Sequence, residues 1–170
     1  LPPPAGNEAA PPPCVLIVDD DPSAVQAIHA ALSGLHARFV FATDGVSALR
    51  HAREQRPDLV LLDMYMPGLD GLEVLRLMRD DEALADTQVI VVTRYAFPEM
   101  EQRALEAGAV DFIAKPYSQA VLQARVRNVL RLKAQAEAMR DAERAHWRRI
   151  GSARLARVVA AASDAIVTAD

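Results

Sequence analysis

The chain reads Val15-Leu16-Ile17-Val18-Asp19-Asp20-Asp21 near its start, an apolar run that ends in three acidic residues. Three later apolar runs also end in polar residues: 59–62 precedes Asp63, 89–92 precedes Thr93, and 110–114 precedes Lys115. Short apolar runs of this kind predict buried strands. Because ligands bind beyond the carboxyl ends of the strands in an open parallel sheet, we expect these polar side chains to gather around one point.

Helical patterns separate the apolar runs, so residues 14–118 alternate between strand and helix. We expect five strands and five helices, with the strands at about 14–19, 38–42, 58–63, 88–93 and 110–114. Such alternation is typical of βαβ units and predicts an α/β fold with a doubly wound parallel sheet. In the second helix, the spacing of Val46, Leu49 and Ala52 predicts that all three face the core.

The 170 residues carry a net charge of −4, which is divided unevenly. Residues 1–118 contain 9 Lys and Arg against 18 Asp and Glu, whereas residues 119–170 contain 10 against 5. An acidic first part and a basic second part indicate two structural units. No recognition motif accompanies the basic residues, so we interpret them as a solvated helix face and do not expect this chain to bind nucleic acid.

Cysteine content and hydropathy indicate the cellular compartment in which we expect this chain. Cys14 is the single cysteine, so an internal disulfide is impossible and a reducing environment fits the chain. No apolar run is long enough to span a bilayer, and the first residues lack the basic and hydrophobic parts of a signal peptide. We therefore expect a cytoplasmic protein that does not interact with membranes.

Four segments are expected along the chain. Residues 1–13 are rich in Pro and Ala and predict a disordered lead-in. Residues 14–130 form the α/β domain, and residues 131–160 form a long helical linker. Residues 161–170 are expected to be the truncated start of a further domain.

The long helix carries a narrow apolar stripe. Val129, Leu132, Ala136 and Met139 follow the alternating three- and four-residue spacing of a coiled-coil seam. An isolated helix of this kind is marginal in water, so we expect it to pair as a coiled coil in a homodimer. The alternative is a lone, Ala-rich linker helix.

The polar strand ends suggest metal and phosphate chemistry. Asp19, Asp20 and Asp63 would repel one another in a partly buried site unless a divalent cation neutralised them. Carboxylate oxygens with room for water suit Mg²⁺ or Mn²⁺. Thr93 can donate a hydrogen bond to a phosphoryl oxygen, and Lys115 can contact one as a point charge. Asp63, central in the sheet, is the best candidate for a nucleophile that forms an acyl phosphate.

Four motifs in this order resemble the receiver domain of response regulators in two-component signalling. They read Val15-Leu-Ile-Val-Asp-Asp-Asp-Pro22, Leu61-Leu-Asp-Met-Tyr-Met-Pro-Gly-Leu-Asp-Gly71, Val91-Val-Thr93 and Asp111-Phe-Ile-Ala-Lys-Pro116. The resemblance covers about residues 14–130 and implies a flavodoxin-like fold with strand order 2-1-3-4-5, here with an extended C-terminal helix. It also implies that Asp63 accepts a phosphoryl group from the phosphohistidine of a histidine kinase or phosphotransfer protein.

The resemblance further implies the ligands of the cation. Asp20 would bind Mg²⁺ directly and Asp19 would act through a water molecule. Asp63 and the backbone carbonyl of Tyr65 would complete the protein ligands.

A switch is implied as well. Thr93 and Lys115 would bind phosphoryl oxygens, and Thr93 would move as the aromatic Phe112 fills the space that it leaves. The bond between Lys115 and Pro116 is often cis in this family. The fourth helix, fifth strand and fifth helix would thereby be reshaped, and the change would reach the long helix.

Arg94 departs from the receiver pattern, in which a small residue usually follows the Thr and leaves the site open. Arg94 could screen the site, slow small phosphodonors, pair with an acid or point to solvent. Tyr65 and Tyr95 also flank the site, and we expect slow intrinsic hydrolysis of the acyl phosphate.

The last residues, 163–170, resemble the opening of a PAS domain, in which a helix precedes a strand that ends in Asp. Residues 165–168 are mostly apolar and themselves predict a strand. Eight residues imply no PAS ligand.

Two rival functions share parts of the pattern. A Mg²⁺-dependent phosphatase of the haloacid-dehalogenase type also uses an aspartyl nucleophile, but it carries a second Asp where this chain has Tyr65. A degenerate receiver would serve only for dimerisation, and Arg94 keeps this alternative open although all five site residues are present. We expect a phospho-acceptor module that is not itself an enzyme.

Overall fold

The computed structural model describes the backbone of residues 11–167 and the side chains of residues 11–161. Five parallel strands form one sheet in the order β2-β1-β3-β4-β5. The strands are β1 (Cys14–Val18), β2 (Arg38–Ala42), β3 (Leu59–Leu62), β4 (Gln88–Thr93) and β5 (Asp111–Ala114). This order confirms the predicted flavodoxin-like fold, in which the strand order reverses between β1 and β3 and creates a binding crevice there.

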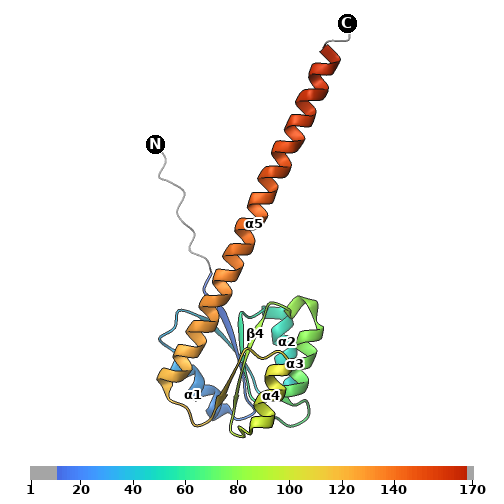
Figure 1. The fold of residues 1–170 in the computed structure, drawn as a ribbon. Coiled ribbons are helices and arrows are strands. Elements are labelled where there is room, and N and C mark those ends of the chain that lie inside the picture. The colour runs from blue at the N-terminus through green and yellow to red at the C-terminus, as the bar shows by residue number, and fades with distance from the viewer. Residues whose placement is uncertain (1–10, 168–170) are drawn as a thin grey trace. The chain divides into compact units, whose positions relative to one another are not determined.

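Helices cover both faces of the sheet. They are α1 (Pro22–Leu32), α2 (Gly45–Gln55), α3 (Gly71–Asp80), α4 (Pro98–Glu106) and α5 (Gln119–Val167), with a short 3₁₀ helix, η1 (Glu82–Leu84), before β4. Figure 1 shows α2, α3 and α4 on one face, and α1 with the first turns of α5 on the other. The five predicted strands and five predicted α-helices are therefore all present.

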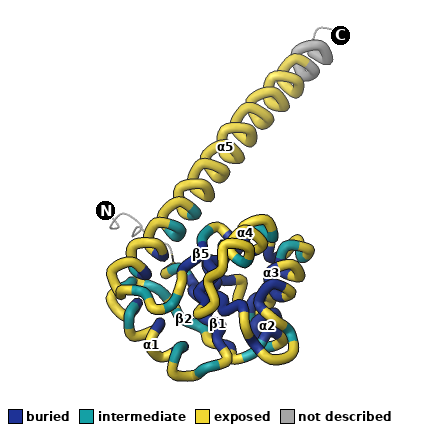
Figure 2. The backbone as a smooth tube through the Cα atoms, turned by 60° about the horizontal axis from the view of Figure 1, so that its bottom comes forward, coloured by how far each residue is buried: buried dark blue, intermediate teal, exposed yellow. Residues whose placement is uncertain are grey.

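Two apolar clusters hold the layers together, because successive side chains of a strand point to opposite faces of the sheet. Leu16 and Val60 pack toward α2, α3 and α4. Val15 and Ile17 pack toward α1 and toward Leu122 of α5. Figure 2 shows buried strand residues at the centre of this domain, whereas the edge strand β2 is only partly buried. Both faces are covered, so the strands read as continuous apolar runs rather than as alternating ones.

The connection from β3 to α3 is fixed by hydrogen bonds. Asp70 caps α3 by accepting from the backbone N–H of Glu73 at 2.8 Å, and Glu73 accepts in return from the N–H of Asp70 at 3.2 Å. Gly71 donates its N–H to the carbonyl of Met64 at 3.0 Å. A β-carbon on Gly71 would lie 2.2 Å from the carbonyl oxygen of Asp63. The close approach of these two backbone segments therefore requires glycine.

One core prediction in α2 is wrong. Leu49 and Ala52 are buried as predicted, but Val46 is 70% exposed. The buried side of α2 centres on Gly45, Ala48, Leu49 and Ala52. At 3.6 residues per turn, Val46 lies roughly 110° away from that centre, so it faces solvent.

The chain divides into two compact units, residues 1–131 and residues 132–170. The boundary falls within the long helix α5, whose first turns are part of the first unit. The chain is helical through Val167, so the strand predicted at 165–168 is wrong over 165–167, and residue 168 lies outside the described residues. Residues 152–167 contain neither Pro nor Gly and are rich in Ala, a good helix former, so the helix continues through them. Leu132 and Met139 are 52% and 67% exposed, and the coiled coil stays a prediction. In the described part of the chain, no helix has the length and apolar character needed to cross a bilayer.

We predict that Gly71→Ala lowers the free energy of unfolding by about 1–3 kcal/mol, the usual cost of overpacking a tightly packed position. The added methyl group would meet the backbone of Asp63 and Met64, neither of which can turn away. Urea unfolding of the purified chain measures the change. Gly34→Ala is the matched control, because a β-carbon there meets nothing within 4 Å. Equal stability of the two variants would show that the Gly71 contact is unimportant.

Candidate functional site

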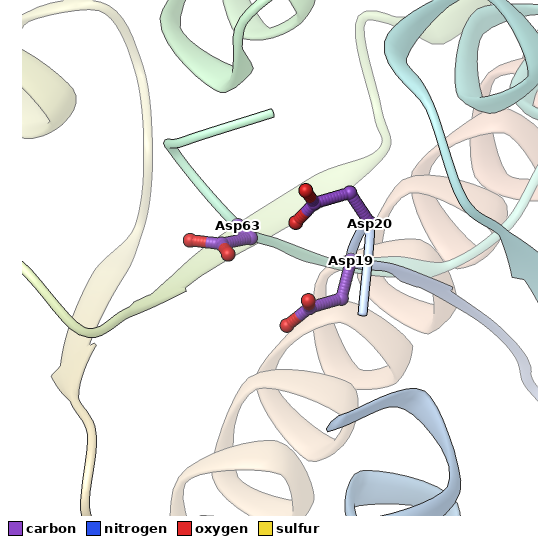
Figure 3. A group of neighbouring side chains, drawn as sticks. All are labelled: Asp19, Asp20 and Asp63. Atoms are coloured by element: carbon purple, nitrogen blue, oxygen red, sulfur yellow. The ribbon is translucent and has the colours of Figure 1, made fainter. Parts of the chain in front are cut away.

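Three acidic side chains meet at the carboxyl ends of β1 and β3. Asp19 follows β1 directly and Asp63 follows β3 directly. Carboxylate oxygens of Asp19, Asp20 and Asp63 lie within 4.8 Å of one another. Figure 3 shows the three carboxylates directed to the same side. Asp19 and Asp63 are buried, whereas Asp20 is exposed, so the group is open to solvent through Asp20.

Lys115 supplies a compensating positive charge. Its ammonium group pairs with Asp19 Oδ2 and lies 3.7 Å from Asp63 Oδ2. The Lys115 backbone N–H donates to the carbonyl of Thr93 at 2.8 Å, which ties the end of β5 to the end of β4. The bond from Lys115 to Pro116 is cis, as predicted. One ammonium group thus bridges carboxylates from two neighbouring strands.

Burial raises the pKa of the Asp63 carboxyl above its ordinary value. The negative charge of Asp19 raises this pKa further, while the Lys115 ammonium, the Thr93 hydroxyl and the Tyr65 N–H lower it. The Tyr65 N–H lies 3.4 Å from Asp63 Oδ1. Because burial is the largest cause, the ionised form of Asp63 is destabilised in the folded chain.

Thr93 is fully buried at the end of β4, and its hydroxyl Oγ1 has no hydrogen-bond partner. The hydroxyl is close enough to Asp63 to favour the ionised carboxylate, although no hydrogen bond of ordinary geometry joins the two groups. A buried polar group without a partner costs roughly 1–3 kcal/mol and calls for an explanation. An additional oxygen on Asp63 would provide the missing acceptor.

The acidic group fits a hard divalent cation. Asp19, Asp20 and Asp63 offer clustered oxygen donors and border a cavity of about 190 Å³, large enough for water molecules to complete the coordination. Carboxylate and water oxygens are the ligands that Mg²⁺ and Mn²⁺ prefer. The backbone carbonyl of Tyr65 as a further ligand stays a prediction.

Four residues form the rim of this cavity. The Arg94 guanidinium pairs with Asp21 through Nη2 and Oδ2 at 2.9 Å, so of the options open for Arg94 the structure shows pairing with an acid. The rings of Tyr65 and Tyr95 meet edge to face with centroids 4.8 Å apart. The rim consists of Asp21, Tyr65, Arg94 and Tyr95. Asp21 was not among the site residues expected from the sequence. Its position directly after Asp19 and Asp20 could have indicated that it borders the site.

The proposed switch residue Phe112 is buried on β5 among the side chains that face α3 and α4. In the register of β4 and β5, Phe112 lies opposite Val91, and Ala114 lies opposite Thr93. Phe112 and Thr93 are therefore on neighbouring strands, and Phe112 lies two residues before the position that pairs with Thr93. A movement that couples them stays a prediction.

Comparison with known proteins places this geometry in a family. A family model described as the response regulator receiver domain matches residues 15–127. The response regulator PleD of Caulobacter vibrioides is 36% identical over 127 residues, which are 75% of this chain and 28% of that protein. The cyclic di-GMP phosphodiesterase response regulator RpfG of Xanthomonas campestris pv. campestris is 40% identical over 98 residues, 58% of this chain and 26% of that protein. The chain thus spans less than a third of these relatives.

Solved structures agree with the sequence match. The receiver domain of the sensor histidine kinase PA1611 from Pseudomonas aeruginosa PAO1 has magnesium coordinated in its active-site cleft. It is similar with a TM-score of 0.65 and 33% identity, covering 70% of this chain and 98% of that one. The BeF3-activated DrrB receiver domain is similar with a TM-score of 0.64 and 28% identity, covering 71% of this chain and 98% of that one.

We predict that Asp63→Asn raises the free energy of unfolding at neutral pH without metal. A carboxyl whose pKa is raised in the folded state destabilises the fold above that pKa, and the cost vanishes below the pKa of the unfolded chain. The stability gain should therefore shrink as the pH falls into the range of ordinary carboxyl groups. Urea unfolding at several pH values in a chelator measures it.

The control for this prediction is Glu101→Gln, which neutralises an exposed acid on α4 and should change stability by no more than about 0.5 kcal/mol. Added Mg²⁺ should stabilise the unmodified chain more than Asp63→Asn, because binding to the folded state adds to stability. A variant Asp63→Asn that is less stable than the unmodified chain at neutral pH would contradict the prediction.

Proposed function

The chain belongs to the response regulator receiver domain family, and we propose that Asp63 accepts a phosphoryl group from the phosphohistidine of a histidine kinase or phosphotransfer protein. The observation that carries the proposal is the unpartnered, buried hydroxyl of Thr93 beside Asp63. Lys115 approaches the same carboxylate at 3.7 Å. We infer that both groups bind phosphoryl oxygens on Asp63, because the Thr93 hydroxyl lacks an acceptor and the Lys115 ammonium already lies near the carboxylate.

The proposed phosphoryl transfer assigns one role to each of these side chains. A carboxylate oxygen of Asp63 attacks phosphorus, the bond from phosphorus to the donor imidazole nitrogen breaks, and the electron pair stays on that nitrogen. Lys115 and Thr93 contact the phosphoryl oxygens and orient the group. When bound, Mg²⁺ held by Asp19, Asp20 and Asp63 supplies the positive charge that offsets the phosphoryl oxygens.

The proposed response of the domain begins at Thr93. Its hydroxyl gains an acceptor when Asp63 is phosphorylated, which favours a position of Thr93 closer to Asp63. Phe112 then occupies part of the space that Thr93 leaves. Phe112 packs in one apolar cluster with Ala104 of α4, so we infer that α4 and β5 change, and that α5, which follows β5 in the chain, changes with them.

We infer that the signal passes through α5 to an output domain outside this chain. Leu132 and Met139 expose apolar side chains on one stripe of the helix, which supports pairing with a second copy as a coiled coil. A degenerate receiver that only dimerises is the remaining alternative. It is disfavoured because Asp63, Thr93 and Lys115 are brought together with the acidic pair.

Phosphorylation at Asp63 is tested by intact mass after incubation with Mg²⁺ and phosphoramidate. We expect the unmodified chain to gain one phosphoryl group and Asp63→Asn to gain none, because the nucleophile is lost. Thr93→Ala and Lys115→Ala should be phosphorylated more slowly, by about tenfold or more, as each loses a contact to the transferring group. A gain that persists in Asp63→Asn would place the acceptor elsewhere. No gain in any chain, including Arg94→Ala, would support the degenerate receiver.

Dimerisation through α5 is tested by light scattering at increasing concentration. We expect a dimer for the unmodified chain and a monomer for Leu132→Glu combined with Met139→Glu, because charges in the seam repel. The matched control is Ala134→Glu combined with Ala138→Glu, which adds the same charges away from the seam. A monomeric unmodified chain, with and without phosphorylation, would contradict the dimer.

A further inference from the structure

We propose that the ion pair between Arg94 and Asp21 is a gate over the phosphorylation site, and that these two residues control the access of small phosphodonors and of water to Asp63. The inference rests on the proposed function of Asp63 as phosphoryl acceptor. It assigns a role to Asp21, and it makes Arg94 a specificity-determining residue of the same site.

The sheet order places this ion pair across the acceptor. Asp21 follows β1, Asp63 follows β3, and Arg94 follows β4, while β3 lies between β1 and β4. A contact from the β1 side to the β4 side must therefore pass the end of β3. Arg94 and Asp21 line the same cavity of about 190 Å³ as Asp63, and their side chains meet at 2.9 Å.

The acidic half of the gate is held in place by the loop after β1. The Asp21 backbone N–H donates to Asp19 Oδ1 at 3.0 Å. The Asp21 carboxylate Oδ1 accepts from the Ser23 N–H at 2.9 Å and caps α1, which leaves Oδ2 for Arg94. The partner of Arg94 is thus fixed to both α1 and the acidic site.

Arg94 is anchored at its backbone, whereas its long side chain is exposed. Arg94 directly follows Thr93, whose carbonyl accepts from Lys115. The Arg94 and Asp21 side chains are 63% and 40% exposed, so solvent screens the pair and it opens often. Tyr65 and Tyr95 line the same cavity, and their rings pack against each other edge to face.

These facts set the size of the effect. On the path past the ion pair, a donor or a water molecule reaches Asp63 in the fraction of time that the pair is open, and the rate along that path is reduced by that fraction. Exposed ion pairs are weak, so breaking this one should raise the rate about two- to fivefold. Phosphorylation by a small donor and hydrolysis of the acyl phosphate use the same opening, so both rates should rise by comparable factors.

The test compares the rates of phosphorylation by phosphoramidate and of later hydrolysis, followed by intact mass, in the unmodified chain and four variants of it. Arg94→Gln removes the charge but keeps a long side chain, and Asp21→Asn removes the partner charge but keeps a good helix cap. The double variant tests coupling, because two halves of one gate should give less than the product of the single effects. Arg76→Gln, an exposed residue of α3, controls for the loss of one positive charge.

Arg94→Gln is the decisive variant. If Arg94 mainly attracts the anionic donor, its loss slows phosphorylation; if the ion pair is a gate, its loss speeds both phosphorylation and hydrolysis. We expect faster rates in Arg94→Gln and Asp21→Asn, a double variant no faster than the better single one, and no change in Arg76→Gln. Slower phosphorylation in Arg94→Gln, or normal rates in Asp21→Asn, would overturn the gate while leaving Asp63 as the acceptor. No phosphorylation of any chain would overturn the proposed function, and the gate with it.

Discussion

One ammonium group among three carboxylates is the interaction on which the site depends. Lys115 contacts Asp19 and approaches Asp63, while Asp20 stands exposed beside them. With all four groups ionised, three negative charges against one positive charge leave a deficit that one divalent cation would balance. Burial of Asp63 makes this deficit costly. The same cost makes the site responsive, because a bound cation or a modified carboxylate changes the local energy strongly.

The backbone holds these charges in place. Three adjacent parallel strands, β1, β3 and β4, end beside one another. The acidic pair, Asp63 and Thr93 occupy the first polar positions at those ends. Gly71 lets α3 begin directly against the backbone of Asp63, and the capping box at Asp70 fixes that start. Rigid placement of this kind is what catalysis by positioning and charge requires.

Thr93 and Arg94 are neighbours in the chain but differ in position: Thr93 lies buried inside the site, and Arg94 lies exposed at its rim. Thr93 is fully buried with an unpartnered hydroxyl, whereas Arg94 reaches out to Asp21 at the cavity rim. Their backbones are continuous, so a shift of Thr93 toward the phosphoryl group would displace Arg94 as well. If Asp63 accepts a phosphoryl group and Arg94 controls access to it, as we propose, one strand end links the two roles.

The sequence by itself determined the five strands, the order of elements and the buried site residues, because apolar runs with polar ends carry a strong local signal. Two predictions from the sequence were wrong. Val46 was expected in the core, but apolar spacing alone did not give the orientation of α2. Residues 165–167 were expected to form a strand, but a short apolar stretch fits strand and helix equally. Only the tertiary structure decided the contact between Asp21 and Arg94. These residues are 73 positions apart, and they meet because the sheet places β3 between β1 and β4, an arrangement that no local pattern encodes.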